Sequence, residues 1–153
     1  MASWNLAMCE VQIQARLLRG RGGRLSRSRL EDLEGAGYAT DSGELLVALV
    51  WLCLPQLPIP EDELNGARRR AMFVLAAGGD PHRELELNSV AAERLAAELD
   101  TPERRKALHT ALSDLPTEDL PTVSEGVSAL LSEPEAAWRC LGLALLADEL
   151  SEE

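Results

Sequence analysis

The sequence predicts an all-α protein, and its composition is the first reason. Only 3% of its 153 residues are aromatic, so the core has to be built from leucine, alanine and valine. Leucine and alanine favour helices, whereas the aromatic and β-branched residues that favour strands are few. Apolar residues at helical spacing and recurring helix caps are the second and third reasons. We expect one domain over residues 1–153, a compact bundle or short array of seven to eight helices.

The expected helices follow one another through short connections. Their approximate ranges are 3–19, 29–34, 43–54, 60–77, 80–100, 101–115, 122–131 and 132–150. The residues expected to cap them are Ser3, Ser28, Asp41, Asp80, Thr101, Thr122 and Ser132. The helix that starts near residue 80 either runs unbroken to Asp100 or begins again at Asn88 or Ser89.

Two connections have a composition of their own. Residues 20–27 form an Arg/Gly-rich segment, which we expect to be a loop because glycine is costly inside a helix. Residues 55–60 form a Pro-rich connection. Proline fixes its own backbone and pushes the preceding residue to an extended form, so this connection is expected to be a stiff, extended spacer.

Residues 43–54 (GELLVALVWLCL) are the most hydrophobic stretch of the chain. As a helix they would be apolar on every side, and such a helix belongs in the centre of a bundle. A buried strand is the alternative interpretation of so short an apolar run. The cap at Asp41 and the lack of a second strand candidate favour the helix.

The strongest local signal is a basic strip. Residues 11–30 contain six arginines and no acid, although the net charge of the chain is −11. Arg21 and Arg24 fall in the expected loop, while Arg27 and Arg29 flank a helix N-terminus, where positive charge is unfavourable. These four arginines are the candidate binding residues. Three interpretations of these arginines stay open. They belong to a solvated loop, they contact an acidic surface of this chain or of a second subunit, or they bind a phosphate or nucleic acid.

Arg21-Gly-Gly-Arg24 is similar to the arginine–glycine segments that bind RNA. The resemblance implies nucleic acid as one candidate partner of the basic strip.

No catalytic motif is evident, and we expect neither a metal nor a cofactor. His82 and Glu86 have one-turn spacing that suits a metal, but an ordinary exposed helix start is the favoured interpretation. A magnesium site is a further hypothesis, with carboxylates from Glu31, Glu34 and the acids at 61–63. It resembles the site of helical nucleotide pyrophosphohydrolases, which place acids on two facing helices. Capping and solubility are the favoured interpretation here as well.

Two further features, the cysteines and the arginines at 68–70, have structural interpretations. Cys9, Cys53 and Cys140 lie far apart in apolar patterns, so we expect free, buried thiols. The arginines at 68–70 are expected to pair with neighbours such as the acids at 61–63.

The motif Trp138-x-x-Leu141-Gly142-x-x-Leu145 is similar to the first helix of a tetratricopeptide repeat. A close helix crossing at Gly142 explains the same pattern.

The sequence favours a cytoplasmic protein that works by protein–protein contact, as a small adaptor, chaperone-like or regulatory protein, with self-association as one form of that contact. No stretch approaches the length of a membrane span, and no signal peptide is visible. Phosphate or nucleic-acid binding through residues 16–29 is the alternative. A carboxylate-dependent, metal-dependent helical hydrolase is the third hypothesis, and an enzyme is the less favoured class.

Overall fold

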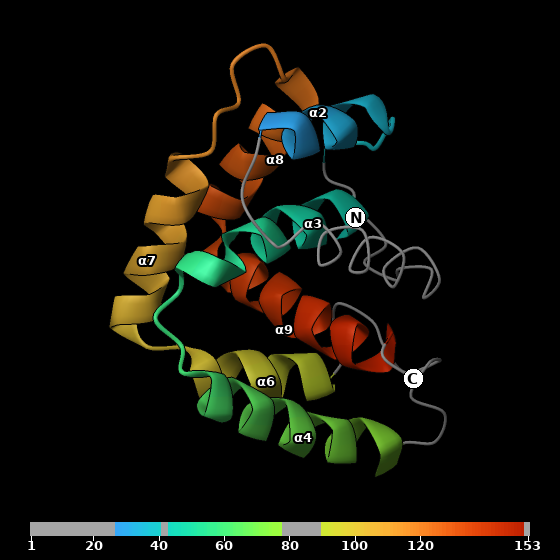
Figure 1. Cartoon of the computed structure of the whole chain (residues 1–153), viewed down its shortest axis with the longest axis vertical. Helices are drawn as coiled ribbons and strands as arrows, with labels where there is room; N and C mark the ends of the chain where they lie inside the picture. The colour runs from blue at the N-terminus through green and yellow to red at the C-terminus, as the bar shows by residue number, and fades with distance from the viewer. Residues whose placement is uncertain (1–26, 41–42, 78–89, 152–153) are drawn as a thin grey trace.

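The computed structural model of the chain describes residues 27–40, 43–77 and 90–151 (Figure 1). These residues form seven α-helices, a short 3-10 helix and no strand, which confirms the predicted all-α class. The helices are α2 (Arg27–Gly35), α3 (Gly43–Cys53), α4 (Glu61–Ala77), α6 (Val90–Leu99), α7 (Pro102–Ser113), α8 (Pro121–Ser132) and α9 (Pro134–Ser151). The helix predicted at 3–19 and the predicted caps or restarts at Ser3, Asp41, Asp80, Asn88 and Ser89 lie outside the described residues. So does the loop predicted at 20–27, except Arg27, which begins α2 instead.

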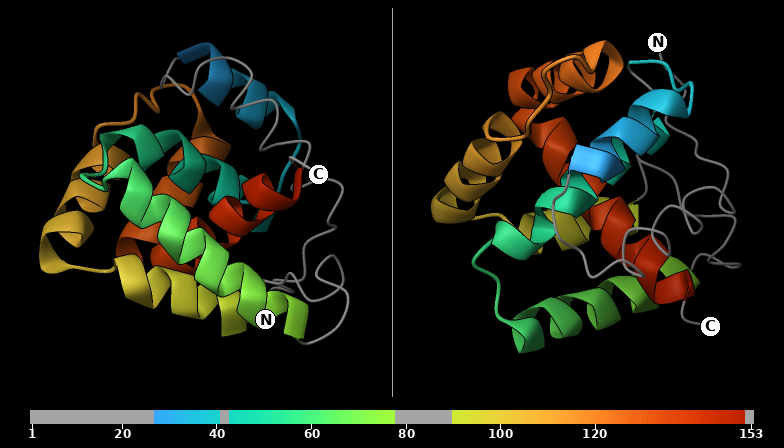
Figure 2. Two further views of the ribbon diagram at one scale, coloured as in Figure 1. Left: turned by 60° about the horizontal axis from the view of Figure 1, so that its bottom comes forward. Right: turned by 45° about the horizontal axis from the view of Figure 1, so that its top comes forward.

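The helices stack from one end of the molecule to the other. α4 packs on α6, α6 on α9, α9 on α3, and α3 on α8, while α2 lies against α8 at the opposite end from α4 (Figure 1). α7 lies along one side and contacts both α3 and α8. The right-hand view in Figure 2 again shows α2 and α8 in the upper half of the molecule and α4 at the bottom. The buried side chains of all these helices form a single hydrophobic cluster.

α3 lies at the centre of the bundle, as its uniformly apolar sequence predicts. Every residue from Leu45 to Cys53 is buried, because α7, α8 and α9 cover different sides of the helix. The alternative of a buried strand is therefore wrong. Burying so many leucine and valine side chains, at about 1.5–3 kcal/mol each, is the main stabilising contribution of this element.

The crossing of α6 and α9 is unusually close. A methyl group added to Gly142 would lie 2.3 Å from the carbonyl oxygen of Ala92 and 3.4 Å from its Cα. The two backbones therefore approach without an intervening side chain, which only glycine allows. This confirms the prediction that a close crossing explains the leucine–glycine pattern around Gly142.

The Pro-rich connection is only partly extended. Leu54–Gln56 form a 3-10 helix with Pro55 in its first turn, where a proline needs no hydrogen bond. Leu57 then adopts φ −85° and ψ 136°, so the extended part of the spacer begins there. The prediction was wrong for the first half of this connection and correct at Leu57.

One predicted cap is confirmed, and three are wrong. The hydroxyl oxygen of Thr101 accepts a hydrogen bond of 3.1 Å from the backbone N–H of Arg104, as an N-cap should. Ser28 and Thr122 each lie inside the helix they were expected to cap, because α2 begins at Arg27 and α8 at Pro121. Ser132 ends α8, and its hydroxyl donates to the carbonyl of Ser128 at 2.9 Å.

The first turn of α8 is capped instead by a side chain from α2. The carboxylate of Glu34 accepts hydrogen bonds from the backbone N–H of Thr122 at 3.1 Å and of Val123 at 2.9 Å. Partial burial raises the pKa of Glu34, but the hydrogen bonds from Val123 and Thr122 outweigh it and the pKa is lowered. A negative charge at a helix N-terminus is favourable, so this contact joins the two helices.

Candidate functional site on the outer face of α4

The four predicted binding arginines are only partly described by the structure. Arg27 and Arg29 lie in the first turn of α2, and this turn contains no acidic residue that would offset them. Arg21 and Arg24 lie outside the described residues. Anion binding by the basic strip therefore stays a prediction.

The acidic residues considered for metal chemistry are not brought together. Glu31 and Glu34 lie on α2, and the acids at 61–63 begin α4 at the opposite end of the bundle (Figure 1). Among the described residues, no group of three histidine, cysteine, aspartate or glutamate side chains is placed to hold a metal. His82 and Glu86 lie outside the described ranges.

Structural roles account for two of these acids. Glu34 caps α8, and Glu63 binds the guanidinium of Arg104 on α7 through both carboxylate oxygens, at 3.0 and 2.7 Å. The hydrogen bond from Arg104 lowers the pKa of Glu63, and the same bond raises the pKa of Arg104.

Arg104 fixes where α4 begins. Besides Glu63, its side chain donates to the carbonyl of Pro58 at 3.3 Å and to the carbonyl of Leu99 at 3.1 Å. The side chain is only 11% exposed. One arginine therefore ties the extended spacer, the first turn of α4 and the end of α6 to α7, and it sets the orientation of α4 on the bundle.

The predicted pairing of the arginines at 68–70 with the acids at 61–63 is wrong for Arg70. Arg70 donates through Nε to Glu98 of α6 at 2.6 Å, so it pairs across helices rather than with the first turn of α4. Arg69 is exposed, and so are Glu61 and Asp62. An acid three or four residues away would be needed for pairing along one helix, and the acids at 61–63 are too distant from Arg70.

Two of the three predicted buried thiols are described, and Cys9 lies outside the described residues. Cys53 and Cys140 are free and buried, as predicted, and burial raises the pKa of each thiol to about 12. Both are therefore protonated near neutral pH, and the thiolate that reacts with electrophiles or metals is scarce.

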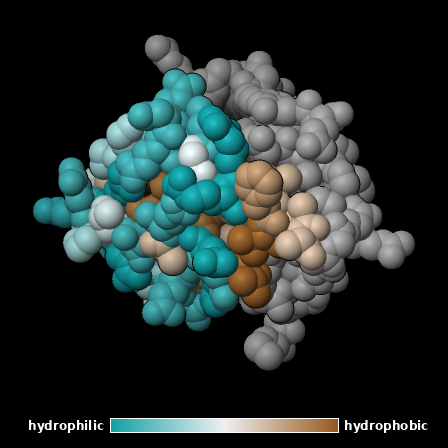
Figure 3. Space-filling view, turned by 90° about the horizontal axis from the view of Figure 1, so that it is seen from below, coloured by the Kyte–Doolittle hydropathy of each residue, from teal (hydrophilic) through white to brown (hydrophobic). Residues whose placement is uncertain are grey.

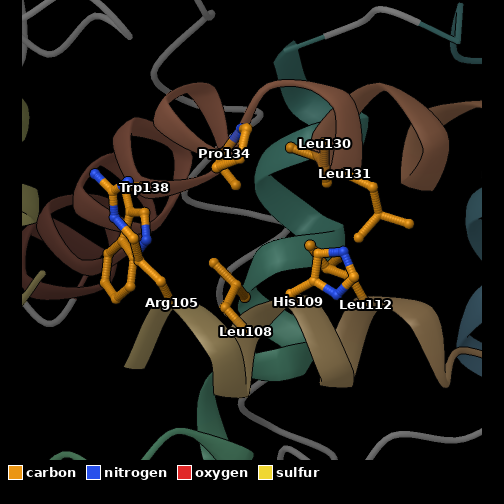
Figure 4. Close-up of a pocket in the computed structure, with 9 residues that line it drawn as sticks. Arg105, Leu108, His109, Leu112, Leu130, Leu131, Pro134 and Trp138 are labelled. Atoms are coloured by element: carbon orange, nitrogen blue, oxygen red, sulfur yellow. The ribbon is translucent and has the colours of Figure 1, made fainter. Parts of the chain in front are cut away.

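A small apolar hollow lies between α7, α8 and α9 (Figure 4). Its volume is about 20 Å³, far below the 300–1,000 Å³ typical of sites for small molecules. Leucines from α7 and α8 and the ring of Trp138 line it, and Arg105 and His109 lie at its edge. Arg105 is held by Asp100 through bonds of 2.7 and 2.6 Å, so its charge is already paired.

A second hollow, at the start of α9, is polar. It is lined by charged side chains of both signs, namely Arg105, Arg139, Glu133 and Glu135. Positive and negative groups occur in equal numbers, so the charges do not select an anion or a cation.

The exposed apolar side chains provide the clearest candidate. Phe73 is 79% exposed and Val90 is 63% exposed, and these are the exposed large hydrophobic residues of the described chain. They lie at the same end of the α4–α6 pair, where α4 ends and α6 begins (Figure 1). Viewed from below, hydrophobic side chains gather on this part of the surface (Figure 3). An exposed apolar patch is typical of an interaction site.

Phe73 belongs to a stripe that faces away from the bundle. Asp62, Asn65, Arg69 and Phe73 recur at the spacing of one helical turn, and all except the half-buried Asn65 are exposed. We call these four residues the outer stripe of α4. The opposite side of the helix buries Ala67, Ala71 and Leu75 against α6 and α9.

Sequence reasoning did not identify Phe73 as a site residue. The spacing of the apolar residues did contain a signal, because Phe73 lies two residues after the buried Ala71 and two residues before the buried Leu75. Two residues along a helix are about 200° apart, so a residue in that position points away from the buried stripe.

Comparison with protein-family models, curated proteins and solved structures gave no match. None of the helices in the described ranges is long and apolar enough to cross a membrane.

Proposed function

We propose that this protein acts by protein–protein contact, as an adaptor, chaperone-like or regulatory protein, and that the outer stripe of α4 makes the contact. The exposure of Phe73 is the observation that carries this proposal. A side chain of this size gains about 1.5–3 kcal/mol when it is fully buried, so leaving it in water is costly unless a partner covers it.

The rest of the surface supports the same interpretation. The first hollow is too small for a small-molecule substrate, and the second, of about 500 Å³, is lined by equal numbers of positive and negative side chains. α4 is also held firmly, since Arg104 binds its first turn and Arg70 joins it to α6. A rigid helix that presents an aromatic anchor loses little conformational entropy when it binds.

The proposed setting is the cytoplasm. Cys53 and Cys140 are retained as thiols rather than joined in a disulfide, and thiols of this kind suit a reducing compartment.

Site-specific photo-crosslinking tests the proposal. A photoreactive phenylalanine analogue at position 73 should yield protein adducts in cells, because the proposed partner covers that side chain. The same analogue at Thr110, which is exposed on α7, is the control and should yield none. Adducts of equal yield at both positions, or none at position 73, would contradict the proposal.

A further inference from the structure

The first half of α4 contains two clusters of opposite charge that lie at equal distances from one point of the helix. Acids occupy positions 61–63 and arginines occupy 68–70, at equal distances on either side of the point between Asn65 and Gly66. Residue 61 mirrors 70, residue 62 mirrors 69, and residue 63 mirrors 68, with opposite charge in every case.

Helix stability explains only half of this pattern. The acids lie in the first turn, where negative charge suits the helix dipole. The arginines have no matching explanation, because α4 continues for seven residues beyond Arg70 to Ala77 and the favourable site for cations is the last turn.

Contacts within the chain use only part of the charge pattern. Glu63 is bound by Arg104, and Arg70 by Glu98. Asp62 and Arg69 are exposed and form no ion pair with any other described residue. Asp62 and Arg69 are the two charged residues of the outer stripe. They lie at equal distances from the point between Asn65 and Gly66, on the same side of the helix as Phe73.

An antiparallel pair of identical helices related by a two-fold axis would use this arrangement. Such an axis places each residue opposite its mirror position in the other copy, so every contact occurs twice. With the axis between Asn65 and Gly66, Asp62 meets Arg69 of the second copy and Arg69 meets Asp62. A parallel pair in register would instead place acid against acid and arginine against arginine.

The same axis provides a partner for the exposed aromatic ring. Phe73 falls opposite position 58 of the second copy, where the exposed Pro58 precedes α4. Arg104 donates to the carbonyl of Pro58 and holds this segment in place.

We propose that the occupant of the outer stripe is a second copy of this chain, docked antiparallel on α4 through Asp62, Arg69 and Phe73. This inference rests on the proposed function and names the partner. An unrelated partner would need neither the equal spacing nor the opposite signs of the two charge clusters. A helix of 17 residues is about 25 Å long, so the pair buries less surface than a permanent dimer and its formation depends on concentration.

Charge exchange in the full-length chain tests the inference. Sedimentation equilibrium should show a wild-type dimer that weakens as salt is added, since the pairs are exposed. Arg69→Glu and Asp62→Arg should each raise the dimer dissociation constant by about tenfold or more, because each change replaces two attractive contacts by two repulsive ones. An equimolar mixture of the two variants should form a heterodimer, and the double variant should form a homodimer again.

Controls separate a specific contact from a change in net charge. Lys106→Glu and Glu125→Arg alter the net charge by the same amounts at exposed positions on α7 and α8, and they should leave the wild-type dissociation constant unchanged. Circular dichroism should show that all variants are folded.

Two sets of results would overturn the inference. One is a wild-type monomer at every concentration, and the other is a dimer that both single variants leave intact or that their mixture does not restore. A monomer that still forms adducts with other proteins at position 73 would contradict the second-copy inference and leave the proposed function standing. A monomer without adducts would contradict both.

Discussion

The two ends of the bundle are joined by different kinds of contact. At one end, α6 crosses α9 with the backbone of Ala92 against Gly142, and no side chain separates the two helices. At the other end, α2 is attached to α8 by the carboxylate of Glu34 and by the buried Leu30 and Leu33. The first contact depends on shape alone and is indifferent to pH. The second depends partly on a charge, and it weakens when that charge is lost.

This difference has a consequence for dynamics. Two helices whose backbones are in contact cannot shift slightly against each other, because a small displacement creates a void or a clash. A polar cap on an exposed edge can open while the core stays intact. We therefore expect the α4–α6–α9 end to behave as the rigid part of the molecule and α2 as its most easily detached helix.

The largest effect is expected from Gly142→Ala. The added methyl group would lie 2.3 Å from a backbone oxygen that cannot move away without displacing α6, so the free energy of unfolding should fall by about 1–3 kcal/mol or more. Urea denaturation measures it. Gly35→Ala is the matched control, since nothing lies within 4 Å of the added group, and it should have little effect. Equal stability of the two variants would show that the close crossing does not exist.

A smaller effect that depends on pH is expected from Glu34→Gln. The folded protein lowers the pKa of Glu34 below its ordinary value of 4.5, so the ionised carboxylate stabilises the fold above that pH. This stabilisation is lost as the pH falls through the lowered pKa. The variant should therefore be less stable than the wild type near neutral pH and approach it in acid.

Thermal melts of the Glu34 variant between neutral pH and pH 3 check this expectation. Glu125→Gln, at an exposed position of α8, is the control and should follow the wild type throughout. A constant difference between Glu34→Gln and wild type at all pH values would mean that the charge does not act as the cap.

The smallest effect is expected from Gly126→Ala at the contact between α8 and α3. The added group would lie 3.1 Å from a methyl of Leu49 and 3.2 Å from a methyl of Leu45, both at the ends of flexible side chains. Crowding there opposes the gain of about 1 kcal/mol in helix propensity. The change in the free energy of unfolding, measured by urea denaturation, should stay within about 0.5 kcal/mol. A larger loss would show that the side chains at this contact are as rigid as the backbone at Gly142.

The elements that sequence predicted well are those fixed by local patterns. The central helix over residues 43–53 follows from a run with no polar side, and the buried stripe of α4 follows from apolar residues at helical spacing. The Thr101 cap is confirmed because the threonine, the proline after it and the amide it accepts from are neighbours in the chain. Gly142 was also visible, since a conspicuous glycine inside an apolar helix indicates a close approach.

Two of the failures involve partners that are distant in sequence. Thr122 has the spacing of a cap, but Glu34 occupies that role from 88 residues away. The arginine at position 70 pairs with Glu98 rather than with the nearer acids of its own helix. No local pattern contains these pairings, because they depend on how α2 and α6 are placed in three dimensions. The outer stripe of α4 was missed for a similar reason, since its function depends on what the stripe faces.

The burial of Cys53 and Cys140 makes them natural reporters of motion. A thiol with a pKa of about 12 in a sealed core reacts with a disulfide reagent only after the surrounding helices separate. The two lie in α3 and α9, which pack against each other and between them contact α4, α6, α7 and α8. Once the labelling of Cys9 is resolved from theirs, their labelling rates measure how often the central helices separate.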